Sequence, residues 1–385
     1  MGNPAEEILT TKQEYLAQNP AKNLIEFENT AQGLKEDDND KYLNLRYMNV
    51  SMKKPEVFIT RAIPREGLER IRENFRVGSW EDYAPPPKQT IIERARSADA
   101  LVTFLSDCVD TEVFDALSNL RMVSQMAVGF DNINVKKASE RGICVTNTPN
   151  VLTETTADFA MTLLMAVARR LVEADKYVRD GKWNVAWHPN MMLGRDVHGA
   201  TLGIVGAGRI GFALAERAKG FKMRILYYDS VTRSEMENKL GAKRESLSDL
   251  LKASDFVSIH VPLTKDTFHL IDSRKLKLMK KTAYLINNSR GAVVDEEALC
   301  NALHNGEIAG AGLDVFEKEP IPENSQLLAL DNVVLAPHIS SASCATRSRM
   351  SVMVAENLIA FFKGEIPPNL VNPQALEVKP LVKCI

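Results

Sequence analysis

The sequence predicts an α/β protein with two doubly wound parallel sheets. Two observations carry this prediction. From residue 53 onward, short apolar runs of strand length alternate with helical patterns, and one of the runs leads into a glycine-rich loop. Strands that alternate with helices of 10–15 residues are typical of βαβ units and parallel sheets. The length of 385 residues corresponds to two or three domains.

Strands are expected first at residues 57–60, 100–104, 122–126 and 143–145, where the apolar runs lie. A helix is expected over residues 64–75, since Leu68, Ile71 and Phe75 share one face, and the prolines at 85–87 indicate a loop. A helix of roughly 25 residues is expected to begin near Thr155, which has capping-box spacing to Asp158. Such a helix could link two domains.

The segment TLGIVGAGRIG, residues 201–211, is the strongest single signal. A strand over 202–205 precedes the glycines and a helix over 212–219 follows them. Gly206 would form the tight turn, Gly208 would let the backbone approach a pyrophosphate, and Gly211 would let helix and strand pack closely. The free N–H groups of the helix terminus would face the phosphates. The residues between the glycines would lie at this mouth: Ala207, Arg209 and Ile210.

The next expected strand, residues 223–228, is followed by Asp229, which lies 18 residues after Gly211. An acid at this distance accepts hydrogen bonds from the adenosine ribose and repels a 2′-phosphate, which favours NAD over NADP. Arg233 keeps NADP open, because a nearby arginine can accommodate that phosphate.

Composition excludes several classes of protein. Hydrophobic residues make up 45% and charged residues 25%, as in soluble globular chains. The net charge of −2 argues against a general nucleic-acid binder, and no apolar stretch approaches the 18 residues of a transmembrane helix. We find no secretory signal, and the five cysteines are odd in number and lack metal-ligand spacing. We therefore expect a cytoplasmic protein without a metal site.

Residues 1–52 differ from the rest, with nine acids and five bases. We expect an N-terminal extension outside the catalytic core, flexible apart from one short helix near residues 5–17. A docking or regulatory role for this extension stays open.

Three later segments place ionisable residues at strand ends: YLINNSRG (284–291), GAGLDVFEKEP (310–320) and NVVLAPHIS (332–340). Arginine offers a rigid two-pronged donor that suits a carboxylate. Together with AVGFDNI (127–133), NTP (147–149) and HVPLT (260–264), these segments resemble the D-isomer-specific 2-hydroxyacid dehydrogenase family. The resemblance extends from Lys53 to Asn372. It is closest to glyoxylate and hydroxypyruvate reductases, in particular those of the archaeal type, through VFITRAIP (57–64), AWHP (186–189), FKMRILYY (221–228) and GEIPPNLVN (364–372).

The resemblance implies a catalytic triad of Arg290, Glu319 and His338. His338 would donate a proton to the keto oxygen during reduction and act as the base during oxidation. Glu319 would hydrogen-bond the imidazole and favour its charged form. Arg290 would bind the substrate carboxylate and polarise the carbonyl.

The resemblance also implies a set of binding residues. The N–H groups of Val128 and Gly129 would take the carboxylate, with Leu105 and Ser106 lining the pocket. Asp314 would contact the nicotinamide carboxamide, and Trp187 would reach toward the partner subunit's active site or pack in the core or dimer interface. The residues that would border the nicotinamide are Thr156, Asn288, Ser289 and Ser340. His260 and His269 are expected to be packing or solvent-facing residues.

The implied architecture is two Rossmann-like domains with a cleft between them. The substrate domain would comprise residues 53–148 and 337–385, and the dinucleotide-binding domain residues 149–336. A homodimer is implied, formed by the helix after Thr155 and the arm at residues 183–192. The expected reaction is NAD(P)H-dependent reduction of glyoxylate to glycolate and of hydroxypyruvate to D-glycerate.

Two alternatives stay open. One is another D-2-hydroxyacid specificity such as 3-phosphoglycerate oxidation, for which Arg61 is a basic residue near the pocket. The other, from a different class, is an NAD-gated scaffold like the C-terminal-binding-protein corepressors, which share the fold.

Overall fold

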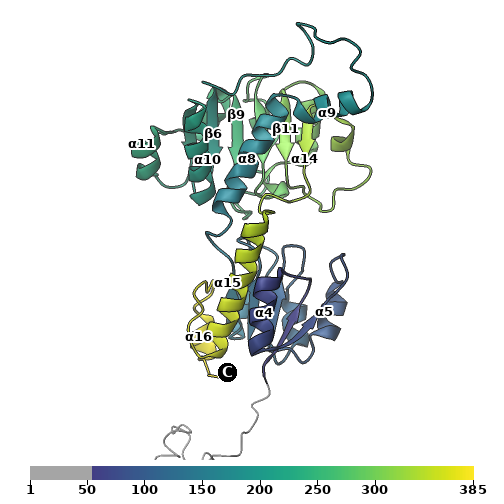
Figure 1. The fold of residues 1–385 in the computed structure, drawn as a ribbon. Coiled ribbons are helices and arrows are strands. Elements are labelled where there is room, and N and C mark those ends of the chain that lie inside the picture. Colours follow the sequence, from purple (N-terminus) through teal and green to yellow (C-terminus); the bar gives the residue numbers. More distant parts are fainter. Residues whose placement is uncertain (1–53) are drawn as a thin grey trace, which may run out of the picture. The chain divides into compact units, whose positions relative to one another are not determined.

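The computed structural model describes residues 54–385 and contains two parallel β-sheets with helices around them (Figure 1). The predicted α/β class is thereby confirmed. The expected N-terminal extension and its short helix lie outside the described residues. Among residues 54–385, no helix has the length and apolar character needed to cross a bilayer.

The first sheet has five strands in the order β2-β1-β3-β4-β5, and every neighbouring pair is parallel. The strands are β1 (Glu56–Ile59), β2 (Arg76–Ser79), β3 (Ala100–Thr103), β4 (Met122–Gln125) and β5 (Cys144–Thr146). Four of them are the predicted ones. The edge strand β2 escaped prediction because its sequence, RVGS, is short and half exposed and so lacks an apolar run.

Helices α4 (Arg65–Asn74), α5 (Lys88–Arg94), α6 (Thr111–Ala116) and α7 (Val135–Glu140) connect these strands. The C-terminal α15 (Cys344–Phe362) packs beside α4, followed by α16 (Ala375–Val378) (Figure 1). Val354 and Phe362 of α15 share one hydrophobic core with Val57 and Ile71. The two helices meet at Gly67, where a Cβ would lie 2.3 Å from the backbone of Ser351. The last helices of the chain therefore complete the core of the first sheet.

The second sheet has seven parallel strands in the order β12-β11-β10-β9-β6-β7-β8. Their bounds are β6 (Thr201–Val205), β7 (Arg224–Tyr228), β8 (Lys243–Arg244), β9 (Phe256–Ile259), β10 (Tyr284–Asn287), β11 (Gly310–Leu313) and β12 (Val333–Leu335). The chain enters at β6, builds outward to β8, and returns to the other side of β6 at β9. Ligands of such sheets bind outside the carboxyl ends of the strands, at the point where the order reverses.

The helices of this half are α8 (Thr153–Ala168), α9 (Leu171–Arg179), α10 (Arg209–Gly220), α11 (Ser234–Leu240), α12 (Leu247–Ala253), α13 (Ser273–Leu276) and α14 (Glu296–His304), with short 3-10 turns at Gly291–Val293 and Gln326–Ala329. Helix α8 is packed among the apolar side chains of β6, β10 and α10. The assignment of residues 149–336 and 337–385 to separate domains stays a prediction.

The single long helix expected after Thr155 is wrong. The chain forms α8 and α9, separated by Arg170 in a left-handed conformation with φ 52°. The predicted capping box is also wrong, because the helix begins two residues earlier at Thr153. The Thr155 hydroxyl instead contacts the Thr346 hydroxyl at 2.7 Å, and Asp158 accepts a hydrogen bond from Arg217. Apolar residues continue on both sides of Arg170. The sequence pattern therefore could not reveal a break that depends on the backbone conformation of this one residue.

Candidate active site

Arg290, Glu319 and His338 follow three neighbouring strands, β10, β11 and β12. Because parallel strands end at the same edge of a sheet, residues just after them can converge. The His338 Nδ1 atom lies 2.8 Å from Glu319 Oε2. The structure thus brings together the imidazole and the carboxylate that the family resemblance predicts to be hydrogen-bonded.

Glu319 is held in its ionised form. Burial alone would raise the pKa of this carboxyl, but the hydrogen bond and charge of His338, with the Phe316 N–H at 3.1 Å, hold the pKa below its ordinary value. The carboxylate can therefore accept from the imidazole over the whole neutral pH range.

His338 is fixed by its backbone as well as by Glu319. Its φ of 55° is unusual for a residue with a side chain. Asp314 holds the segment in place: its carbonyl accepts the His338 N–H at 2.9 Å, and its buried carboxylate accepts the N–H groups of Ile339 and Ser340 at 2.8 Å each. The Ser340 hydroxyl adds a further bond to the same carboxylate. Asp314 was predicted to contact the nicotinamide, and this second contribution, positioning the histidine loop, was not foreseen.

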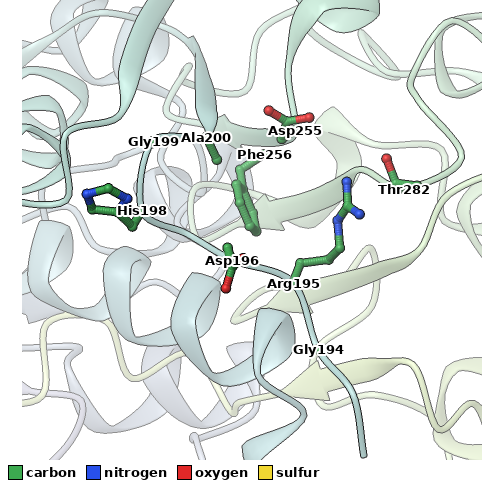
Figure 2. Close-up of a pocket in the computed structure, with 9 residues that line it drawn as sticks. All are labelled: Gly194, Arg195, Asp196, His198, Gly199, Ala200, Asp255, Phe256 and Thr282. Carbon is green, nitrogen blue, oxygen red and sulfur yellow. The ribbon is translucent and has the colours of Figure 1, made fainter. Parts of the chain in front are cut away.

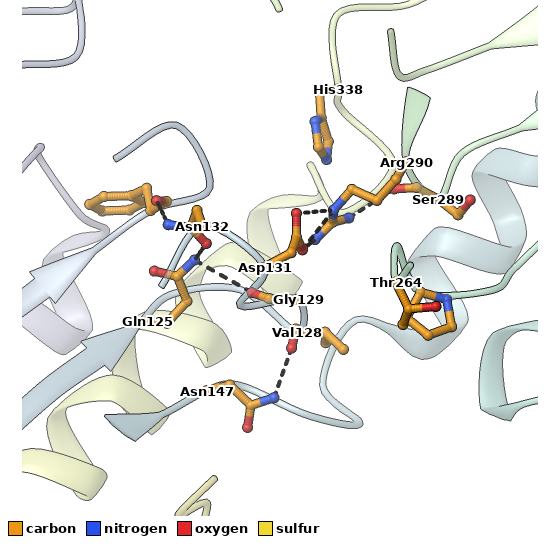
Figure 3. Close-up of polar contacts among 12 residues, drawn as sticks. Gln125, Val128, Gly129, Asp131, Asn132, Asn147, Thr264, Ser289, Arg290 and His338 are labelled. Carbon is orange, nitrogen blue, oxygen red and sulfur yellow. Dashed lines mark hydrogen bonds and ion pairs between the residues drawn. The ribbon is translucent and has the colours of Figure 1, made fainter. Parts of the chain in front are cut away.

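Arg290 extends toward the loop after β4, where it pairs with Asp131 (Figure 3). Its Nε donates to the two Asp131 carboxylate oxygens at 3.0 and 3.2 Å, and its Nη1 donates to the Ser289 carbonyl at 2.8 Å. A Cβ added to Gly129 would lie 1.8 Å from Arg290 Nη2. The guanidinium thus lies directly against the backbone of Gly129.

Four backbone N–H groups donate to no other described residue: those of Leu105, Ser106, Val128 and Gly129, the last of which lies against Arg290. Two loops present them, one after β3 and one after β4. Unpaired N–H groups beside an arginine make a site suited to a small carboxylate. The resemblance implies that Val128 and Gly129 bind the substrate carboxylate through these groups and that Leu105 and Ser106 line the pocket.

Amide side chains, of which Gln125 is buried and Asn132 and Asn147 are half-buried, hold the two loops together (Figure 3). Gln125 donates to the Asn132 side chain at 2.8 Å, and Asn132 donates to the carbonyls of Phe104 and Asp107 at 3.0 and 2.7 Å. Asn147 donates to the Val128 carbonyl at 2.8 Å. Sequence reasoning missed this frame, because an amide's partner across two loops has no sequence pattern.

The glycine-rich loop lies between β6 and α10, and its three glycines differ in their surroundings. Gly206 has φ 95° and a Cβ there would lie 2.8 Å from the His260 backbone, whereas a Cβ on Gly211 would lie 2.4 Å from the Gly206 carbonyl. A Cβ on Gly208 would meet nothing within 4 Å. Gly208 therefore faces open space, as an approaching pyrophosphate requires. Ala207 and Arg209, at the start of α10, line a groove of about 650 Å³, whereas Ile210 packs against the apolar core.

Asp229 follows β7 and contacts Ala207 and Arg233, two residues that line this groove. Burial would raise its pKa, but the Val231 N–H, Arg233 and the Ala207 N–H hold the pKa below its ordinary value. Arg233 donates to the carboxylate at 3.1 and 3.2 Å, and Arg244 donates to the Asp229 carbonyl at 2.9 Å. An ionised acceptor and two arginines therefore lie at the expected adenosine ribose.

The residues expected to border the nicotinamide include two buried oxygens that have no partner among residues 54–385, Thr156 Oγ1 and Asn288 Oδ1. Asn288 Nδ2 donates to the Thr156 carbonyl at 3.0 Å, so the two residues lie side by side. An unpaired buried acceptor costs free energy unless a ligand satisfies it. These orphaned oxygens and the open face of Gly208 fit a dinucleotide.

Other residues named from the sequence have different surroundings. Trp187 is 77% exposed on the arm after α9. Burial lowers the pKa of His260 to about 4, which makes it a neutral packing residue. His269 is not merely a packing or surface residue, because its Nε2 lies 2.8 Å from Glu317 Oε1. The sequence around His269 contains no pattern that indicates Glu317 as its partner.

A second pocket lies at the opposite edge of the large sheet, lined by residues before β6, β9 and β10 (Figure 2). It includes Arg195, Asp196, His198, Asp255 and Thr282. Because it lies at the amino ends of the strands, it is separate from the catalytic edge.

Comparison with known proteins gives concordant similarities. Residues 161–340 match the model of the NAD binding domain of D-isomer specific 2-hydroxyacid dehydrogenases. A glyoxylate reductase of Korarchaeum cryptofilum is 64% identical over 327 residues, covering 85% of this chain and 98% of that protein. A glyoxylate reductase of Thermococcus gammatolerans is 56% identical over 329 residues, with the same coverage.

Solved structures are similar as well. A Thermus thermophilus protein gives a TM-score of 0.78 at 45% identity, covering 82% of this chain and 99% of that one. An NADPH-dependent glyoxylate/hydroxypyruvate reductase of Sinorhizobium meliloti, solved with NADP and malonate, gives a TM-score of 0.72 at 36% identity, covering 84% and 98%.

Proposed function

The chain belongs to the D-isomer-specific 2-hydroxyacid dehydrogenases, and from this premise we propose that it reduces glyoxylate to glycolate and hydroxypyruvate to D-glycerate with NAD(P)H. The proposal rests on the contact of 2.8 Å between His338 and Glu319. The two residues follow β12 and β11, and Arg290 follows the neighbouring strand β10. The similar proteins of two archaea that are named glyoxylate reductases support the substrate.

His338 acts as the general acid. Its Nδ1 faces Glu319, which leaves Nε2 to carry the proton that the keto oxygen receives. When bound, the dinucleotide supplies the hydride that the carbonyl carbon receives. Glu319 stabilises the charged imidazole before transfer and keeps the ring in one orientation. In oxidation, the same nitrogen takes the proton from the hydroxyl group.

The substrate carboxylate binds to the free N–H groups of Val128 and Gly129 and to the tip of Arg290. The same arginine polarises the carbonyl, because its charge lies beside the developing alkoxide. Leu105 and Ser106, whose backbone N–H groups donate to no other described residue, would line the rest of the pocket. Thr156, Asn288, Ser289 and Ser340 would hold the nicotinamide half, and residues 206–211 with Asp229 the other half.

A phosphorylated substrate is disfavoured by the surroundings of Arg61. Its Nη2 donates to the buried Asp107 at 2.6 Å and to Ser106 at 2.7 Å. Asp107 also accepts from Thr60 and from the Phe104 N–H. Since this carboxylate neutralises Arg61, the arginine holds the loop after β3 instead of offering a free charge to a phosphate.

Absorbance at 340 nm with purified protein tests the proposal. Glyoxylate, hydroxypyruvate, pyruvate and 3-phosphohydroxypyruvate are each offered with NADH and with NADPH. We expect rapid oxidation with the first two, and a loss of about 100-fold or more in His338→Ala. Turnover of the phosphorylated acid alone would contradict the substrate. Dinucleotide binding without any turnover would favour the scaffold alternative.

We further propose a homodimer, with Trp187 contributing to the partner's active site. Apolar side chains lie exposed along α9 and the arm that follows: Leu171, Val172, Val178, Trp183, Val185, Trp187 and Leu193, each at least half exposed. A patch of this kind marks an interaction site. All five cysteines are unpaired, which supports a reducing, cytoplasmic location.

A further inference from the structure

Asp131 and Arg290 come from different sheets. Asp131 lies on the loop after β4 of the first sheet, and Arg290 follows β10 of the second. The Arg290 Nη2 atom lies 2.9 Å from Asp131 Oδ1, in addition to the Nε contacts already described. Arg290 keeps only 21% of its side chain exposed, so the pair is partly shielded from solvent.

The contacts of Arg290 leave one part of its guanidinium unused. Of five N–H donors, the Nε donor and one Nη2 donor face Asp131, and one Nη1 donor goes to the Ser289 carbonyl. The remaining hydrogens at the tip lie toward Gly129, against which Nη2 is packed. The unused tip therefore lies beside the unpaired N–H groups of Val128 and Gly129.

We propose that Asp131 is a positioning residue for the reaction: it fixes the rotation of the Arg290 guanidinium so that the tip, and not the side, meets the substrate. This inference rests on the proposed function for its kinetic consequences. Because the Asp131 carboxylate occupies the Nε side of the guanidinium, the 2-keto acid is also directed to a single face of the arginine. Preorganised donors cost no reorganisation during the reaction, so the gain falls on kcat/KM for the keto acid.

A double-mutant cycle tests this coupling. Asp131→Asn keeps the shape and removes the charge, and it should lower kcat/KM for glyoxylate at least tenfold, equivalent to about 1.4 kcal/mol. The KM for NADH should stay within twofold. Lysine lacks the two-pronged guanidinium. In an Arg290→Lys background, Asp131→Asn should therefore lower kcat/KM by less than a further twofold. Equal losses in both backgrounds would overturn the proposal, because a merely structural role is additive.

Two further variants sharpen the cycle. Asp131→Glu retains the charge and should recover part of the activity lost in Asp131→Asn. Asp115→Asn serves as the matched control, because it removes an exposed carboxylate that pairs with Arg141 in the same sheet region. Its kcat/KM should equal that of the unmodified chain.

A measurement without turnover separates this proposal from the proposed function. In ¹⁵N spectra, the Arg290 Nε–H should exchange slowly with water in the unmodified chain and rapidly in Asp131→Asn, with Arg290→Lys identifying the resonance. If the unmodified chain reduces no 2-keto acid, the proposed function fails, and this exchange alone decides the role of Asp131. Unchanged slow exchange in Asp131→Asn overturns it.

Discussion

At the scale of single residues, the site relies on backbone conformations that side chains rarely adopt. His338, with φ 55°, is held by four hydrogen bonds from its loop to Asp314. A residue in this region costs about 1–3 kcal/mol. The surrounding bonds offset that cost and fix the imidazole before substrate arrives.

The charge of Glu319 should support catalysis. Its pKa lies below the ordinary value, so the carboxylate is ionised at neutral pH. In Glu319→Gln, a neutral amide faces His338 Nδ1 in place of this charged acceptor. We expect kcat for reduction at neutral pH to fall about tenfold or more, as steady-state rates would measure, with the exposed Glu323→Gln as control. An unchanged kcat would count against the pairing.

Gly129 should tolerate no side chain. In Gly129→Ala the new Cβ would lie 1.8 Å from Arg290 Nη2, so the guanidinium must move. We expect kcat/KM to fall about 100-fold, the range typical of a lost transition-state donor. The Tm should change little, because the displaced group is the end of a flexible side chain.

Gly220→Ala is the matched control for that variant, since its Cβ would meet nothing within 4 Å. Full activity in Gly129→Ala would show that Arg290 does not depend on this close approach.

At the scale of elements, the strands were more predictable than the turns. The fully buried β3, β6, β9 and β10 read as continuous apolar runs, as in parallel sheets covered on both faces. The two-residue edge strand β8 and the break at Arg170 depend on tertiary contacts and left no periodic pattern.

The site divides in the same way. Arg290, Glu319 and His338 were expected as a triad because the segments that carry them resemble those of the family, and each follows a strand of the large sheet. Asp131, Asp107 and His269 could not, because their partners lie on loops far away in the chain. Their chemistry becomes visible only when those loops are packed together.

The end of β7 should decide cofactor preference. Asp229→Ser removes the ionised acceptor and frees Arg233, which now donates to it at 3.1 Å. We expect the ratio of kcat/KM with NADPH to that with NADH to rise about tenfold, a change of about 1.4 kcal/mol. Arg233→Ala in the same background should reverse the gain. An unchanged ratio would show that Asp229 does not contact the ribose.

At the scale of the whole molecule, the exposed side chains of α9 should matter only in an assembly. Val172 and Val178 are each 54% exposed. Replacing both with Glu should give a species with the single-chain mass of 42.8 kDa, measured by light scattering, whereas the unmodified chain should have twice that mass. The exposed Lys239→Glu is a control remote from α9. A monomeric unmodified chain would contradict the proposed dimer.

Residues 54–385 form a compact unit of their own. The chain without residues 1–53 should therefore keep its kcat/KM within twofold and its Tm within a few degrees, as steady-state rates and thermal unfolding would measure. A large loss of either would assign the N-terminal residues a part in catalysis or stability.

The two sheets contribute different kinds of groups to the proposed reaction. The large sheet supplies reactive side chains, whereas the small sheet presents mainly backbone N–H groups set in a frame of amides. Backbone donors survive any substitution that preserves the loop. Evolution can therefore vary Leu105, Ser106 and Val128 to change the accepted acid while the carboxylate is still recognised. Grafting residues 104–107 from a relative should accordingly transfer its substrate range and leave the hydride chemistry intact.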